Sequence, residues 1–160
     1  MKLALYQPDI PQNTGALLRL AACFGIGLDI IEPCGFVLDD KRLKRVAMDY
    51  GADVTITRFG SWEHFKEARA AQRIILLSTK ATQSYCTLAY QPDDILLLGS
   101  ESAGVPATVF AETTTAVRIP QVPTARSLNV AMSAGIVVSE ALRQTEPQWQ
   151  TLFLEASCNP

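Results

Sequence analysis

The sequence has little of what several common site chemistries need. It carries one histidine, His64, and none of its four cysteines is spaced as Cys-x-x-Cys, which argues against a structural zinc site. His64 stands among charged neighbours on a predicted helix, and no serine lies in a Gly-x-Ser-x-Gly elbow. The sequence therefore argues against a serine hydrolase triad.

An excess of positive charge is also lacking. The formal net charge is −2 and the isoelectric point is about 5.4, which argues against a protein that coats nucleic acid through bulk charge. No apolar run reaches membrane-spanning length, and the short run after Lys2 is interrupted by Gln7, Pro8 and Asp9. We expect a cytoplasmic protein with reduced cysteines and no membrane contact.

What is present is the composition of one packed domain. The chain has 160 residues, of which 48% are hydrophobic and 19% charged. The regular apolar patterning fades after residue 143. We expect a single domain over residues 1–143 and a C-terminal tail over 144–160.

Apolar runs alternate with segments of helical spacing along that domain. The runs predict strands at 2–6, 28–31, 54–57, 74–77, 95–98 and 116–119. Helices are predicted over 14–24, about 39–49, 61–71 and 128–142, with Gly25 ending the first and Ser61 capping the third. Several strands are continuous apolar runs, as in sheets covered on both faces. The pattern predicts an α/β fold: a mostly parallel six-stranded sheet with helices on both faces.

Two glycine-rich segments resemble nucleotide-binding motifs but fail in context. Gly25 to Gly27 lies after a helix and before a strand, the reverse of a dinucleotide fingerprint, and is better explained as a helix end. Gly99 to Gly104 has the glycine spacing of a P-loop, but Val105 and Pro106 follow where lysine and serine or threonine are needed.

Three segments next to strand ends carry polar residues, where open α/β folds bind ligands. In the first, residues 11–19, Asn13 is placed to cap a helix, and Arg19 has no acid three or four residues away on that helix. In the second, residues 98–106, Gly99 either admits a ligand to the backbone or simply ends a strand. In the third, residues 119–131, Ser127 and Asn129 are either helix caps or functional groups.

Together, and in this order, the three segments resemble the SPOUT class of RNA methyltransferases. They are most similar to the small subgroup that methylates the ribose of the tRNA wobble nucleotide. The resemblance covers about residues 2–140 and includes Ile31-Glu32-Pro33, Gly35-Phe36 and the stretch from Asp39 to Leu43. Serine at position 100, where many relatives have proline, is a small departure.

The resemblance implies a C-terminal trefoil knot, which sequence physics alone would not propose. The loops around 77–83, 99–106 and 119–129 would form it and enclose a bent S-adenosyl-L-methionine, with S-adenosyl-L-homocysteine as product and no metal. Backbone groups would hold the adenine, and Glu101 would lie near the methionine moiety. By motif match, the cofactor site comprises Leu77, Gly99, Glu101, Ile119, Ser127 and Leu128.

The implied reaction is methyl transfer to the ribose 2'-hydroxyl of the wobble cytidine or uridine of tRNA. The family assigns removal of the hydroxyl proton to an arginine that matches Arg19. Arginine rarely gives up its own proton, so a substrate phosphate, or an orienting and charge-stabilising role of Arg19, stays open. Asn13, Ser127 and Asn129 would position the hydroxyl.

The resemblance also implies a homodimer whose active site draws on both chains. The predicted helix 128–142 is apolar on most faces, which favours a partner, although a fully buried core helix explains it too. The densest positive cluster either contacts tRNA or is a solvated face paired with nearby aspartates. It consists of Lys41, Arg42, Lys44 and Arg45.

Two other functions stay open at this point. One is 2'-O-methylation of ribosomal RNA or of another tRNA position, although such siblings often carry an extra N-terminal domain. The other is a noncatalytic RNA-binding protein on the same scaffold. Retention of Asn13, Arg19, Ser127 and Asn129 together argues against the noncatalytic alternative.

Overall fold

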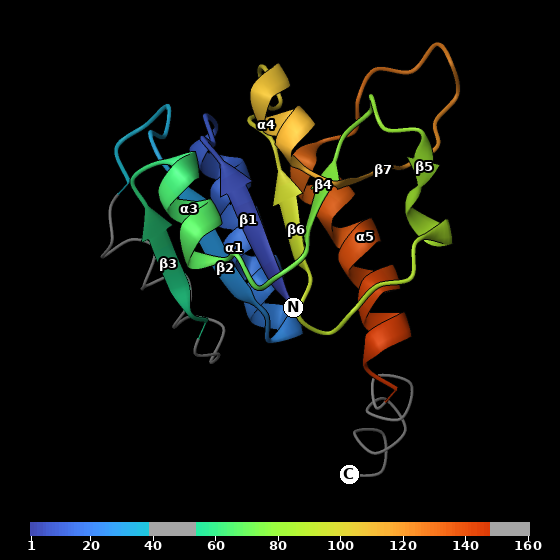
Figure 1. The fold of residues 1–160 in the computed structure, drawn as a ribbon. Coiled ribbons are helices and arrows are strands. Elements are labelled where there is room, and N and C mark those ends of the chain that lie inside the picture. Colours follow the sequence, from blue (N-terminus) through green and yellow to red (C-terminus); the bar gives the residue numbers. More distant parts are fainter. Residues whose placement is uncertain (39–53, 148–160) are drawn as a thin grey trace, which may run out of the picture.

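A computed structural model describes residues 1–38 and 54–147 (Figure 1). Its strands and helices alternate along most of the chain, as the apolar pattern predicts. The strands are β1 (Lys2–Tyr6), β2 (Gly27–Ile31), β3 (Ile56–Phe59), β4 (Ile74–Leu77), β5 (Gln83–Ser84), β6 (Ile95–Leu98) and β7 (Thr115–Arg118). The helices are α1 (Pro11–Phe24), α3 (Trp62–Ala68), the short 3-10 helix η1 (Tyr85–Thr87), α4 (Ala107–Glu112) and α5 (Val130–Thr145).

The described strands form one sheet in the order β3-β2-β1-β6-β4-β7-β5, and all of its pairings are parallel. The predicted count of six strands was wrong, because the sheet has seven. The additional strand, β5, is two residues long at the edge beside β7 and has no apolar pattern that would predict it. The parallel α/β class itself is confirmed.

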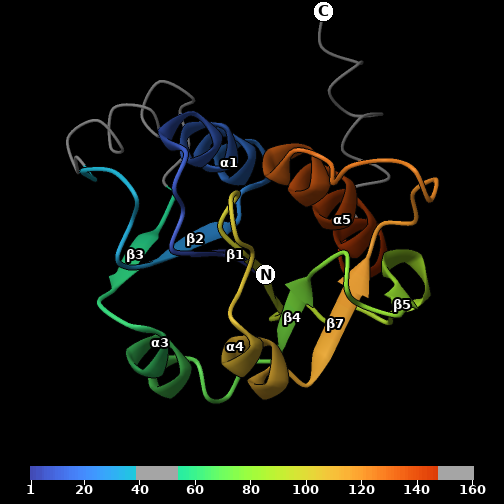
Figure 2. The same ribbon diagram turned by 90° about the horizontal axis from the view of Figure 1, so that it is seen from above.

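Helices cover both faces of the sheet, as predicted. Seen from above, α1 and α5 lie on one face and α3 and α4 on the other (Figure 2). Successive strand residues therefore alternate between two buried cores: Leu3 and Leu5 pack on the α1/α5 side, Ala4 and Tyr6 on the α3/α4 side. Burial on both faces explains why the central strands are continuous apolar runs.

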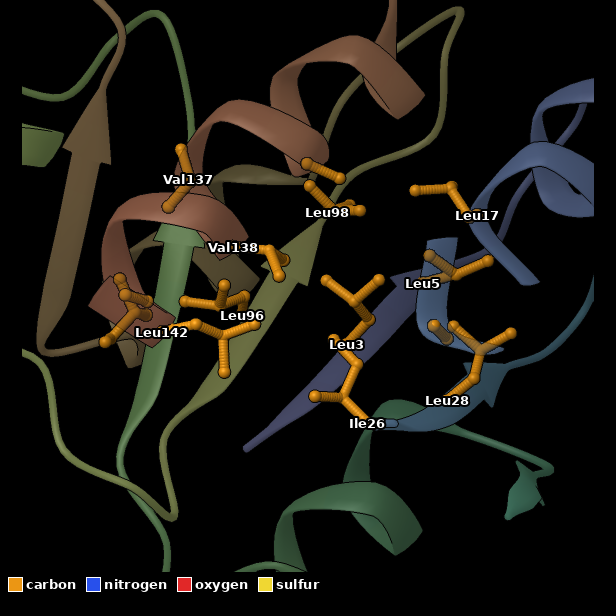
Figure 3. Packing of buried hydrophobic residues seen from close by; sticks show 14 of the residues in the cluster. Leu3, Leu5, Leu17, Ile26, Leu28, Leu96, Leu98, Val137, Val138 and Leu142 are labelled. Carbon is orange, nitrogen blue, oxygen red and sulfur yellow. The ribbon is translucent and has the colours of Figure 1, made fainter. Parts of the chain in front are cut away.

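Helix α5 buries one apolar stripe against the sheet and against α1 (Figure 3). The stripe follows helical periodicity and consists of Ala134, Val137, Val138, Ala141 and Leu142. Not every face is covered, since Met132 keeps 61% of its surface exposed. The core accounts for the buried stripe but leaves Met132 without an explanation within one chain.

Local signals at helix ends are mostly confirmed. Gly25 ends α1 in the left-handed conformation at φ 63°, and the Ser61 side chain caps α3 by accepting from the His64 N–H at 3.2 Å. The interpretation of Asn13 as a cap was wrong. Helix α1 begins at Pro11 after Ile10, because proline suits the first turn, so Asn13 lies inside the helix.

Several predicted boundaries shift by a few residues. Strand β3 lies two residues later than predicted and β7 one residue earlier, while β4 and β6 match their predictions. Helix α3 ends at Ala68 and α5 extends to Thr145. Helix α4 was not predicted, because six residues give too little periodicity to recognise. The helix predicted over about 39–49 lies outside the described residues.

Candidate functional site

A cavity of about 500 Å³ lies at the carboxyl ends of β4, β6 and β7. Its walls come from the residues that follow these three strands and from the first turn of α5, with Asn13 of α1 at its margin. This is where a ligand is expected in an open parallel sheet, because the chain leaves the sheet there and frees backbone groups. The volume lies in the range of small-molecule sites, about 300–1,000 Å³.

All six residues predicted to hold the cofactor line this cavity. Leu77 ends β4, Gly99 follows β6 and Ile119 follows β7, so each of the three is positioned by a different strand. Glu101 comes from the turn after Gly99. Ser127 and Leu128 come from the segment that enters α5.

The turn after β6 folds tightly back on the strand end. The N–H of Ser100 donates to the Gly104 carbonyl at 3.0 Å, and the Gly104 N–H donates to the Ser100 carbonyl at 2.8 Å. A side chain at Gly99 would meet the Gly104 backbone, because a Cβ there would lie 2.5 Å from the carbonyl carbon. Gly104 itself has φ 70°. Both glycines are therefore required by the shape of the cavity wall.

Three predicted polar residues form one hydrogen-bonded chain beside the cavity. The side-chain amide of Asn13 donates to Glu101 Oε1 at 2.9 Å. The amide of Asn129 donates to Asn13 Oδ1, also at 2.9 Å. Asn129 Oδ1 in turn accepts from the N–H groups of Ala131 and Met132, which caps α5. Asn129 thus serves both as a cap and as a partner of Asn13, while Ser127 is exposed and does not cap.

Asp9 joins the same network, and sequence reasoning missed it. Its carboxylate accepts the backbone N–H of Glu101 at 3.1 Å and that of Ser102 at 3.2 Å, and the Ser102 hydroxyl donates to it as well. Hydrogen bonding with Glu101 and then with Ser102 lowers the pKa of Asp9 to about 2. An aspartate next to a proline in a turn-rich segment does not indicate a hydrogen bond to a residue 92 positions away in the sequence.

Arg19 lies on the exposed face of α1, about six residues or 9 Å of helix rise beyond Asn13. It does not line the cavity of its own chain. A second chain or a bound RNA is therefore needed if Arg19 is to approach the reacting group. The geometry of this chain brings Asn13, Ser127 and Asn129 to the cavity and leaves Arg19 apart.

Other polar residues line the cavity from within the loops predicted to form it, although they were not singled out individually. Ser78, Thr79 and Lys80 follow β4, and Gln121 follows β7. Lys80 is exposed and adds a positive charge at the cavity. Their position just after apolar strands was the sequence feature that could have identified them as lining residues.

The predicted basic cluster from Lys41 to Arg45 lies outside the described residues. Within residues 1–38 and 54–147, no group of three or more histidine, cysteine, aspartate or glutamate side chains is arranged to hold a metal ion. None of the helices in that part of the chain is long and apolar enough to cross a membrane.

A parallel α/β sheet with a cavity beyond its strand ends, walled by a glycine-rich turn, is the architecture of α/β proteins that bind a small ligand. The family model of the SpoU rRNA Methylase family matches residues 1–139. The chain belongs to that family.

Comparison with individual relatives sharpens the likeness. A tRNA (cytidine(34)-2'-O)-methyltransferase from Beijerinckia indica is 51% identical over 89% of this chain and 90% of its own. A structure solved to explain 2-OH methylation of C/U34 on tRNA superposes with a TM-score of 0.81 at 38% identity, covering 89% of this chain and 94% of that one. An AdoMet-bound rRNA methyltransferase from Sinorhizobium meliloti superposes with a TM-score of 0.76 at 28% identity, covering 89% of this chain and 55% of that one.

Proposed function

We propose that this protein transfers a methyl group from S-adenosylmethionine to the ribose 2'-hydroxyl of the tRNA wobble nucleotide, cytidine or uridine. The observation that carries the proposal is the convergence of the segments after β1, β6 and β7 on one cavity. The relatives that match nearly end to end are named for this reaction. The proposed place of action is the cytoplasm, where tRNA is modified.

The cavity suits the proposed methyl donor in size and in lining. Leu77, Ile119 and Leu128 offer apolar contacts for an adenine ring, and Gly99 keeps side chains away from the backbone there. S-adenosylmethionine supplies an activated sulfonium methyl group and leaves as S-adenosylhomocysteine. The protein has then only to bind the ribose, orient its hydroxyl and stabilise the charge that develops as the proton leaves.

Orientation falls to the polar residues at the cavity. Asn13, Ser127 and Asn129 would hold the 2'-hydroxyl in line with the methyl group, which removes much of the entropic barrier. The oxygen forms the new bond to carbon as its proton leaves. Arg19 would orient the ribose and stabilise the charge growing on that oxygen, and a substrate phosphate would take the proton.

A methyl-transfer assay with labelled donor and an unmodified tRNA transcript tests the proposal. We expect label at nucleotide 34, located by mapping of ribose methylation. Arg19→Ala should abolish transfer and leave calorimetric binding of S-adenosylhomocysteine unchanged. Arg143→Ala, which removes another exposed arginine far along α5, is the matched control and should keep full activity.

Other outcomes would replace the proposal. Label at a different nucleotide or in ribosomal RNA would mean a sibling specificity, and RNA binding without any transfer would mean a noncatalytic protein. Near-normal turnover in Arg19→Ala would remove that residue from the mechanism.

A homodimer with composite active sites is part of this proposal. The remoteness of Arg19 from its own cavity and the exposure of Met132 near the start of α5 support it. Light scattering should give twice the chain mass for the wild type and a lower mass for Met132→Glu. A monomeric wild type with full activity would contradict the composite site.

The basic cluster is proposed as a contact to tRNA, on its sequence alone. Lys44→Glu combined with Arg45→Glu should weaken tRNA binding and flatten its salt dependence. Unchanged affinity and unchanged salt slope would make the cluster irrelevant to RNA.

A trefoil knot formed by the loops around 77–83, 99–106 and 119–129 is likewise proposed. Its support is that all three loops meet at the cavity. A crystal structure in which the backbone could be straightened completely by pulling on its two termini would contradict the knot.

A further inference from the structure

Asp9 and the turn at Glu101 and Ser102 hold each other by reciprocal hydrogen bonds. The Asp9 carboxylate accepts from both backbone N–H groups of the turn, and the backbone N–H of Asp9 donates to Glu101 Oε2 at 3.0 Å. The turn is thereby tied to the loop between β1 and α1. Loss of the Asp9 carboxylate would release the backbone of the turn that carries the Glu101 side chain.

The orientation of Glu101 decides which way two asparagine amides point. Glu101 Oε1 accepts from the side-chain amide of Asn13, so Asn13 turns its NH₂ group toward Glu101 and its oxygen toward Asn129. Asn129 must then donate its own NH₂ to Asn13 and keep its oxygen for the start of α5. The donors therefore point toward Glu101 from both sides: from the start of α5 through Asn129 and Asn13, and from the backbone N–H of Asp9.

The backbone around Asp9 is itself firmly placed. Gln7 has φ 46°, a conformation that non-glycine residues adopt only when surrounding contacts impose it, and its N–H donates to the Ile31 carbonyl at 2.8 Å. The Gly35 N–H donates to the Pro8 carbonyl at 2.9 Å. A Cβ at Gly35 would lie 2.8 Å from Asp9 Cβ, so only glycine permits this approach. Asp9 therefore packs between Gly35 and the turn at Glu101 and Ser102.

We propose that Asp9 is a positioning residue for methyl transfer, which acts through Glu101 to set the amide orientation of Asn13 and Asn129. This inference rests on the proposed function, since the two asparagines are there assigned to the ribose hydroxyl. Asp9 does not line the cavity, so it would act on the reaction through its hydrogen-bond partners. Its effect should therefore fall on turnover more than on binding.

The test is a double-mutant cycle between Asp9→Asn and Glu101→Ala, with Asp93→Asn as matched control because Asp93 is an exposed acid away from the cavity. Asp9→Asn places an NH₂ group against a backbone donor and should lower kcat about 10- to 100-fold, the effect of misplacing a reacting group by about 1 Å. KM for tRNA should change less than about threefold. Asp9→Glu, which keeps the carboxylate, should recover part of kcat.

In the Glu101→Ala background, Asp9→Asn should cost no further activity, because its route to the asparagines is already cut. Additive losses, or a loss in Asp9→Asn that appears in stability alone, would overturn the proposal. Side-chain amide resonances of Asn13 and Asn129 provide a readout that needs no turnover. They should shift in Asp9→Asn and stay in place in Asp93→Asn.

The two proposals fail in different ways. If the wild type transfers no methyl group but the amide resonances shift as expected, the proposed function is wrong, whereas the control of the amide orientation by Asp9 stands. If transfer occurs and the resonances do not move in Asp9→Asn, the positioning role is wrong.

Discussion

Replacing Gly99 by alanine tests whether the wall of the cavity is as tight as the structure has it. The new Cβ would lie 2.5 Å from the Gly104 carbonyl carbon and 2.7 Å from its Cα, where ordinary contact begins at 3.4 Å. Both obstacles are backbone atoms of a hydrogen-bonded turn, so the turn must retreat by about 1 Å. A displacement of that size would misplace the methyl donor, and a misplacement of about 1 Å costs on the order of 100-fold in reaction rate.

Calorimetric titration with S-adenosylhomocysteine and the methyl-transfer assay measure this effect. We expect Gly99→Ala to weaken binding and to lower the rate of methyl transfer on the order of 100-fold. Gly15→Ala is the matched control, since a Cβ at that position meets nothing within 4 Å and lies inside α1. It should leave binding unchanged and stabilise the fold by about 0.5–1 kcal/mol. Equal binding by the two variants would refute the assignment of the cavity.

Two predictions concern charge. Asp29 is fully buried, and Arg69 donates two hydrogen bonds to its carboxylate, at 2.7 and 3.0 Å. Arg69→Met should therefore lower the free energy of unfolding, measured in urea, by about 3–5 kcal/mol. Arg143→Met, which removes an exposed ion pair, should lower it by less than about 1 kcal/mol. Equal costs would contradict this burial argument. The pKa of Asp9 is lowered from 3.8 to about 2, so its contribution is present above pH 3.8 and lost as the pH falls toward 2. The difference in urea midpoint between wild type and Asp9→Asn should hold from neutral pH to about pH 4 and shrink below it; a difference that grows in acid would show the opposite sign.

Much of the fold could be predicted because burial leaves a pattern in the chain. Strands β4 and β6 are unbroken apolar runs, and their bounds were predicted without error. Gly25 and Ser61 mark helix ends through local backbone chemistry that needs no distant partner. The cofactor residues were found through motif resemblance, and their predicted roles there stay predictions.

Short elements with long-range partners escaped prediction. Strand β5 has two residues and forms because they pair with the edge of β7. Asn13 has the sequence setting of a cap, but its partners Glu101 and Asn129 are brought to it by the sheet.

The sequence by itself determined the class of fold, the run of buried strands and the segments from which a site had to come, because periodicity and glycine placement are local properties. The tertiary structure alone decided that β6 lies between β1 and β4, and hence that the turn after β6 meets the loop after β1. Strand order depends on packing between segments far apart in the chain. That is why Asp9, 92 residues from its partner, appears at the site only once the sheet is assembled.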